Sequence, residues 1–117
     1  MDNSILEDIK ALLHIAAEYD YFDRQVIMYI NSAFSILYQL GVGRPFSING
    51  YDEKWSDYPS VADMDILGCI KPYIYIRTRI AFDPPTSGFL TESYNKQMSE
   101  LEWRMNIVSD PQDIDWD

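Results

Sequence analysis

The chain has very little cysteine and histidine, which removes several kinds of functional site. Cys69 is the only cysteine among 117 residues, so an internal disulfide and a cysteine-based metal cluster are excluded. Its neighbours Leu67 and Ile70 predict a small buried hydrophobic residue rather than a reactive thiol. His14 is the only histidine, and the sequence around it supplies no metal-binding or catalytic partner.

Catalytic motifs are also lacking. The sequence contains no glycine-rich phosphate loop, no Cys-x-x-Cys and no Gly-x-Ser-x-Gly. Asp63 with Asp65, and Asp113 with Asp115, could suggest magnesium ligands, but nineteen acidic residues produce such pairs by chance. We therefore expect neither an enzyme nor a metal or cofactor site.

Long apolar runs are absent as well. No basic segment followed by an apolar run opens the chain, and no window approaches the roughly 18 apolar residues of a membrane span. The sequence predicts no membrane segment, and a protein that is cytosolic or part of a soluble assembly. A chain of 117 residues is expected to form one domain that buries about two thirds of its unfolded surface.

Positive charge is scarce. Nine basic residues face nineteen acidic ones, a formal net charge of −10. Phosphate repels such a chain at long range, so sequence-reading or wrapping of nucleic acid is disfavoured. On one interpretation the negative charge keeps the protein soluble. On the other, the acidic residues line a channel through which DNA passes without binding, and such a channel requires a ring of subunits.

The first helix is predicted from Ser4 and Glu7, a capping-box pair. An apolar stripe then runs to about Ala17, with His14 inside the helix. The residues of this stripe are Ile5, Ile9, Leu12, Leu13 and Ala16.

A second helix is predicted to begin at Asp20 or Asp23, either of which could be its N-cap, and to end at Gly41 as a C-cap. Its core stripe consists of Val26, Ile30, Ala33, Leu37 and Leu40, and Ile27, Phe34 and Tyr38 widen it. A helix that is apolar over so wide an arc lies either at the centre of a bundle or at a subunit interface.

Between Val42 and about Ser60 the helical period disappears, and glycine and proline residues predict a long loop. A small β-hairpin could form from 46–48 and Tyr51 around Asn49-Gly50. Trp55 is expected to fold back onto the core rather than to bind a ligand. The residues predicted to form an axial loop in an assembly are Arg44, Phe46, Asn49, Gly50, Tyr51 and Lys54.

The segment 61–82 fits two patterns. A three-four period through Cys69, Tyr73 and Ile80 favours a helix, whereas alternation over 73–80 favours a strand. Pro72 costs a helix about 3 kcal/mol, although a bend at Gly68 could accommodate it. On a helix Arg77 and Arg79 diverge by about 200°, so each is expected to pair with an acid rather than to join a DNA-binding patch.

The segment 82–89 separates this element from the last one. Pro84 and Pro85 lack the N–H that a helix needs, and Thr86 and Ser87 can cap a new helix. These four residues therefore predict a corner between two helices.

The final helix is predicted over 89–108. Glu92 with Lys96, and Glu100 with Arg104, are spaced for exposed ion pairs. Its apolar face consists of Leu90, Tyr94, Met98, Leu101, Met105 and Val108.

The segment 110–117 is expected to form an extended acidic tail after the domain 1–109. Terminal residues are commonly disordered, but Ile114 and Trp116 lie on one side of an extended chain and could dock into a partner.

Three of these elements resemble the head-to-tail connector proteins of long-tailed bacteriophages. They are the Phe-Asp-Pro-Pro-Thr-Ser turn at 82–87, the Glu-Trp-Arg element at 102–104, and the Tyr-Ile-Tyr-Ile-Arg run at 73–77. The resemblance covers roughly 60–108 well and the N-terminal helices in general character. It implies that 61–82 is a helix, with a bend near Gly68 to Pro72.

The expected fold is therefore all-α: a four-helix antiparallel bundle, with a long loop between the second and third helices. Aromatic residues make up 15% of the chain, more than such a bundle must bury, which suits protein interfaces. The candidate subunit or portal interface consists of Tyr73, Tyr75, Arg77, Arg79, Trp103, Arg104, Ile114 and Trp116.

The resemblance also implies a function. Proteins of this family form a ring, by resemblance a dodecamer, beneath the portal protein of the capsid, and the ring meets the next neck or tail-completion protein. DNA passes through without sequence-specific binding. Such a protein would be made in the host bacterial cytoplasm and reside in the neck of the virion.

The alternative is an acidic protein-binding module, such as a DNA-mimicking inhibitor of a nucleic-acid enzyme. An inhibitor of this kind would present carboxylates in a regular surface array. Here the acidic residues are scattered among helix caps, loop and tail.

Overall fold

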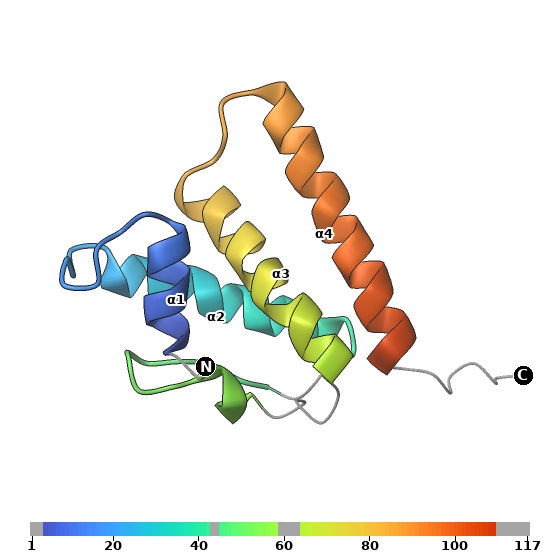
Figure 1. Cartoon of the computed structure of the whole chain (residues 1–117), viewed down its shortest axis with the longest axis horizontal. Helices are drawn as coiled ribbons and strands as arrows, with labels where there is room; N and C mark the ends of the chain where they lie inside the picture. Colours follow the sequence, from blue (N-terminus) through green and yellow to red (C-terminus); the bar gives the residue numbers. More distant parts are fainter. Residues whose placement is uncertain (1–3, 43–44, 59–63, 110–117) are drawn as a thin grey trace, which may run out of the picture.

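The fold is all-α, and four helices pack together in the part of the chain that the structure describes (Figure 1). The computed structural model describes residues 4–42, 45–58 and 64–109. Within these ranges there is no strand, so the helical alternative for 73–80 is confirmed. The elements are α1 (Ile5–Leu12), α2 (Asp23–Gln39), a short 3₁₀ turn (Trp55–Asp57), α3 (Met64–Phe82) and α4 (Gly88–Ser109).

Helix α3 is the central element, because it contacts each of the other three helices. It runs antiparallel to α4, and α2 crosses it (Figure 1). The core stripe predicted for α2 is buried at Val26, Ile30, Ala33 and Leu37, whereas Leu40 is 40% exposed. The sequence left two places for α2, the centre of the bundle and a subunit interface. In the structure the central helix is α3, and α2 packs against it.

Helix α1 is shorter than predicted: it ends at Leu12, not near Ala17. Its last turn closes through hydrogen bonds from the His14 N–H to the Ala11 carbonyl and from the Ile15 N–H to the Lys10 carbonyl, the pattern of a Schellman motif. His14 therefore lies outside the helix, with φ at 65°.

The apolar pattern extends beyond the end of α1 because Leu13 and Ile15 still pack against the core after the chain has turned. Apolar spacing alone therefore could not mark where the helix stops. At the start of α1 the predicted cap is present at its serine, since the Ser4 hydroxyl accepts a hydrogen bond from the Glu7 N–H.

The N-cap predicted for the second helix is wrong. Phe22 is the N-cap, with no side-chain hydrogen bond, and Asp23 is the first helical residue. The Asp23 carboxylate instead binds Lys10 and Tyr51, which leaves it unavailable for capping. Helix α2 stops just before Gly41, close to the prediction: the C-cap is Leu40, and Gly41 after it has φ at 90°, a conformation that glycine adopts without strain.

The small β-hairpin predicted near Asn49-Gly50 is absent from residues 45–58. The side chain of Asn31 on α2 takes both backbone groups of Ile48: it accepts from the N–H at 2.8 Å and donates to the carbonyl at 3.0 Å. These are the groups that a hairpin partner would need. The loop instead meets the start of the chain, where an isolated bridge joins Ser4 to Lys54.

Trp55 folds back onto the core, as predicted. Its side chain is 6% exposed, and its indole N–H donates to the Asp8 carboxylate at 2.8 Å. The Lys71 ammonium lies over the ring and pairs with the same carboxylate. A loop that carries little regular structure is thus fixed to α1 and α3.

The bounds of the last two helices follow the prediction closely, although Leu90 of the predicted apolar face is 41% exposed. Helix α3 continues through Pro72 to Phe82, and α4 begins at Gly88. The inner face of α4 is buried at Leu101 and Met105, and Tyr94 and Met98 pack partly against the core. No helix among the described residues is both long and apolar enough to span a lipid bilayer.

Candidate assembly surfaces

The corner between α3 and α4 occupies residues 83–87. The Ser87 hydroxyl accepts a hydrogen bond from the Leu90 N–H at 3.3 Å, so Ser87 caps α4 as predicted. Pro84 and Thr86 are exposed, and Pro85 is half-buried. The two prolines therefore occupy the turn itself, outside both helices.

Tyr73, Arg77 and Glu102 form a network between α3 and α4. The Tyr73 hydroxyl donates to the Glu102 carboxylate at 2.7 Å and accepts from Arg77 Nε at 2.9 Å. Arg77 also approaches Glu102, at 3.7 Å. Burial raises the pKa of Tyr73 to about 12, assisted by the hydrogen bond to Glu102 and opposed by Arg77. Tyr73 is fully buried, so its role is to join two helices within one subunit.

Arg79 is held at the C-terminal end of α3. Its Nε lies 4.0 Å from the Asp83 carboxylate and donates to the Asp83 carbonyl at 3.1 Å. The guanidinium also lies over the Tyr94 ring, 5.9 Å from its centroid. Arg77 and Arg79 thus each pair with an acid of the same chain, as predicted. Tyr75 is half-buried beside them.

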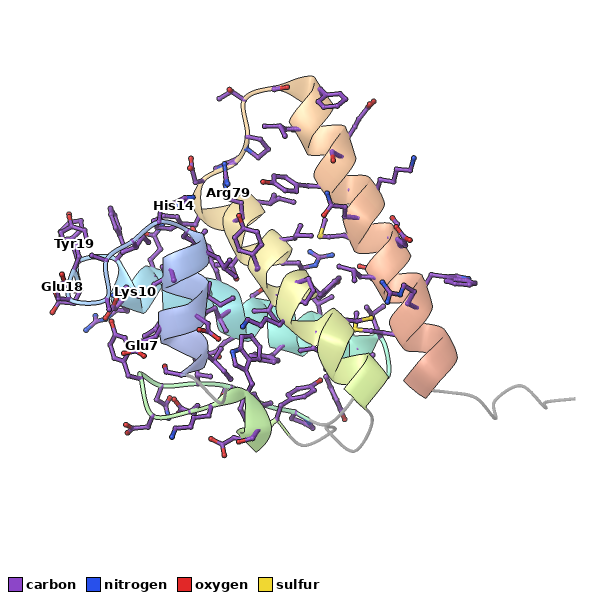
Figure 2. All side chains as sticks on the ribbon, in the orientation of Figure 1. Glu7, Lys10, His14, Glu18, Tyr19 and Arg79 are labelled. Carbon is purple, nitrogen blue, oxygen red and sulfur yellow. The ribbon has the colours of Figure 1, made fainter. Side chains whose placement is uncertain are left out.

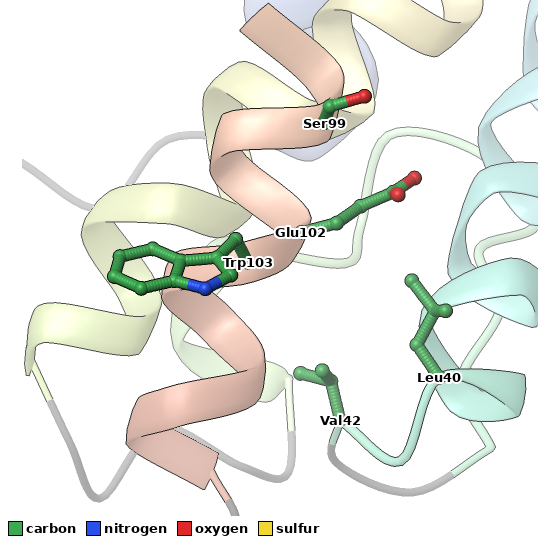
Figure 3. A pocket seen from close by; sticks show the side chains of 5 residues that line it. All are labelled: Leu40, Val42, Ser99, Glu102 and Trp103. Atoms are coloured by element: carbon green, nitrogen blue, oxygen red, sulfur yellow. The ribbon is translucent and has the colours of Figure 1, made fainter.

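Trp103 and Arg104 lie on the exposed side of α4, and the Trp103 side chain is 64% exposed. A shallow cleft of about 210 Å³ separates this part of α4 from the end of α2. In Figure 3, Glu102 extends toward the α2 side of the cleft, whereas the indole of Trp103 projects to the other side of α4. The residues that line the cleft are Leu40, Val42, Ser99, Glu102 and Trp103.

The residues predicted to form an axial loop are mostly tied to the subunit. Phe46 packs edge-on against Phe34, with ring centroids 5.0 Å apart. The N–H groups of Asn49 and Gly50 donate to the Glu53 carboxylate. The Lys54 N–H donates to the Asp57 carboxylate at 2.9 Å.

Arg44, Ile114 and Trp116 lie outside the described residues, as does the whole predicted tail. Their proposed parts in the axial loop and the interface stay predictions.

Tyr51 belongs to a buried cluster that the sequence did not reveal. Lys10 on α1 is completely buried, and its ammonium lies 2.6 Å from Asp23 Oδ1 and 2.6 Å from the Tyr51 hydroxyl. The Tyr51 hydroxyl donates to Asp23 Oδ2 at 2.6 Å. Burial by itself disfavours both charges, but the hydrogen bonds within the cluster outweigh it, raising the pKa of Lys10 and lowering the pKa of Asp23.

One sequence signal could have found this cluster. Lys10 follows Ile9 and falls four residues after Leu6, on the apolar side of α1. A lysine in such a place is buried only when it is paired. Its partners, however, come from a loop and a helix that no local pattern connects to it.

Several exposed aromatic side chains were also missed by the sequence predictions. Tyr21 is 76% exposed and Tyr19 50%, both in the loop between α1 and α2, and Phe89 at the start of α4 is 79% exposed. Among the described residues, no group of histidine, cysteine, aspartate and glutamate side chains could hold a metal ion. The exposed aromatic side chains suit contacts with other proteins.

No curated protein and no solved structure matches the chain significantly. A family model described as phage connector protein matches residues 5–112, which is most of the chain. Connector proteins are structural components of the virion that link head and tail, interact with other head and tail proteins, and are generally not enzymes. The chain belongs to the phage connector protein family.

Proposed function

We propose that this protein forms a ring beneath the portal protein of the capsid and joins it to the next neck or tail-completion protein. The ring, a dodecamer by family resemblance, continues the portal channel toward the tail. The protein has a structural role and catalyses no reaction. It is made in the host bacterial cytoplasm and is built into the neck of the virion.

The observation that supports this proposal most strongly is the set of large aromatic side chains exposed on ordered elements. Trp103 on α4 is 64% exposed and Phe89 79%. Aromatic residues are enriched in protein interfaces, where they supply much of the binding energy. Burial of these side chains against a neighbouring subunit or the portal protein would remove their apolar surface from water.

The net charge of −10 supports the channel function. Carboxylates on the inner wall of a ring would repel DNA phosphates from every side. DNA would then pass along the axis without binding to the wall.

Native mass spectrometry of the purified protein, alone and with the portal protein of the same phage, tests the proposal. We expect a complex that contains one portal and several copies of this chain. A small oligomer that ignores the portal and instead binds a nuclease or polymerase would contradict the proposal and favour a DNA-mimicking inhibitor.

A further inference from the structure

The loop between α1 and α2 carries an exposed ridge of alternating acidic and aromatic residues: Glu18, Tyr19, Asp20 and Tyr21. Tyr19 and Tyr21 are 50% and 76% exposed, and Glu18 and Asp20 are also exposed. The two tyrosine rings lie against each other, with centroids 6.3 Å apart. Figure 2 shows Glu18 and Tyr19 at the outer edge of the molecule, beyond Lys10.

Contacts with α1 and α3 hold the backbone of this ridge in place. The buried Lys10 ammonium donates to the carbonyls of Ala17 and Tyr19, at 3.1 and 2.9 Å. At the other end of the ridge, Phe22 packs edge-on against Phe82 of α3, with centroids 5.2 Å apart. Because the backbone is already ordered, a partner that binds the ridge loses little free energy to loop ordering.

The charges of the ridge define the partner's chemistry. Neither Glu18 nor Asp20 forms an ion pair with any described residue. A surface that offers positive charge beside an aromatic or apolar side chain would satisfy both the carboxylates and the tyrosines.

The outer face of α4 presents two cations beside an exposed indole, and the exposed acids Glu92 and Glu100 lie on the same face. Trp103 is exposed there, Lys96 lies seven residues earlier on the same side, and Arg104 follows directly. The predicted pairs of these cations with Glu92 and Glu100 are absent: in the part of the chain that is described, neither Lys96 nor Arg104 forms an ion pair. Both cations are therefore available to a partner.

The two surfaces lie on opposite edges of the molecule, with the α1–α2 loop on the left in Figure 1 and α4 on the right. A single subunit cannot bring them together, but two copies can. Contacts between two different surfaces of identical subunits are head-to-tail, and such contacts close into rings when the rotation allows.

We propose that the Glu18–Tyr21 ridge of one copy docks on the outer face of α4 of the next copy, around Trp103 and between Lys96 and Arg104. This inference rests on the proposed ring and assigns the surfaces that close it. Tyr19 and Tyr21 pack against the indole, and the two acids approach the two cations.

Cross-linking tests the contact in the complex with the portal protein. Ala17→Cys and Glu100→Cys, combined in one chain, place a thiol beside each surface without removing its aromatic residues. Cys69 is buried, so the natural chain supplies a low background. With a short bis-maleimide we expect a ladder of covalent oligomers. The matched control combines Met28→Cys, an exposed position on α2, with Glu100→Cys and should give no ladder.

Charge exchange provides a second, independent reading. Reversing both acids (Glu18→Lys with Asp20→Lys), or both cations (Lys96→Glu with Arg104→Glu), should lower the assembled fraction roughly tenfold. Combining all four substitutions should restore most of it. The acid-reversed variant changes exposed loop residues and should keep the melting temperature of the natural protein. The variants with Lys96→Glu and Arg104→Glu place four glutamates at i,i+4 spacing on α4 and should melt slightly lower, so assembly is compared well below the melting temperature of each variant.

The outcomes separate this inference from the proposed function. A ring bound to portal that gives no ladder and no rescue leaves the proposed function standing and overturns the ridge-to-α4 contact. Failure of the natural chain to form a portal complex overturns both.

Discussion

His14 occupies a backbone conformation that costs an L-residue free energy. With φ at 65°, it stands at the position after the α1 C-cap where glycine is usual. The left-handed conformation costs roughly 1–2 kcal/mol, and glycine would avoid it while losing more entropy on folding. We expect His14→Gly to stabilise the subunit by about 0.5–1 kcal/mol, measured as the free energy of unfolding in urea.

Two control variants separate the backbone effect from the side chain. His14→Ala keeps the left-handed conformation and removes only the imidazole, so it should not stabilise the subunit. Gly41→Ala places a side chain at the equivalent turn after α2, where φ is 90° and open space surrounds the added carbon, and should therefore destabilise it. If His14→Ala stabilised the protein as much as His14→Gly, the backbone conformation would not be the cause.

Tyr73 links stability to alkaline pH. Its folded pKa is about 12, above the value near 10 of an unfolded tyrosine. A raised pKa means that the neutral phenol is favoured in the folded state, so this contribution is complete below about pH 10 and is lost as pH rises toward 12. Tyr73→Phe removes the titrating group. The free energy of unfolding of the natural protein, minus that of Tyr73→Phe, should fall by about 2–3 kcal/mol across that window.

Denaturant melts at several pH values measure this difference. Tyr38→Phe, at a side chain that is 51% exposed, is the matched control and should show no such change. If the difference in unfolding free energy between the natural protein and Tyr73→Phe stays constant from about pH 9 to about pH 12, the Tyr73 hydroxyl is not buried in the network with Glu102.

Individual residues were predictable where their partners are close in sequence. Ser87 caps the helix that begins at the next residue, and Arg79 pairs with Asp83 four residues on. Lys10 was not predictable in this way, because Tyr51 lies 41 residues away. The choice of Asp20 or Asp23 as an N-cap failed for the same reason: the long-range pair with Lys10 occupies the Asp23 carboxylate.

At the scale of elements, the packing of α3 explains why its sequence fits both a helix and a strand pattern. Tyr73, Ile74, Ile76 and Thr78 are all buried, although no single helix face contains them all. Because α3 packs against three other helices, residues two apart can both be inside. That arrangement creates the alternation that is typical of a strand, and only the tertiary contacts resolve it.

The corner at 83–87 is the element on which the arrangement of α3 and α4 depends. We expect replacement of Pro84 and Pro85 by alanine to reduce assembly with the portal far more than helix content, because alanine permits other angles between α3 and α4. Circular dichroism measures the helix content, and native mass spectrometry measures the portal complex.

Ser87→Ala is the matched control for this experiment. It removes the cap of α4 and should cost about 1 kcal/mol of stability without changing the angle of the turn or the yield of complex. Unchanged ring formation by the double alanine variant would show that the prolines do not set the geometry.

At the scale of the whole molecule, the fold was more predictable than the surface. Helical periods and breakers located three of the four helices, since these signals are local, whereas for 61–82 they left helix and strand open and the family resemblance favoured the helix. The ridge at Glu18–Tyr21 was not found, because the residues after Ala17 were treated as a short junction between two helices and Asp20 was considered only as a candidate N-cap. Exposure of Tyr21 follows from how the loop is held, and the sequence does not contain that information in any short pattern.

The net charge makes a final prediction about DNA. With nineteen acidic and nine basic residues, the purified subunit should not retard duplex DNA in a gel even at about 50 mM salt. A protein with roughly six to ten phosphate contacts binds about 10³–10⁵-fold more tightly at that salt than at about 200 mM, so low salt would reveal even a weak basic site. A retarded complex that disappears as salt is raised would mean that Lys96, Arg104 and other exposed cations gather into a phosphate-binding surface. In that case the channel would bind DNA, and the proposal of an acidic channel wall that repels DNA would be wrong.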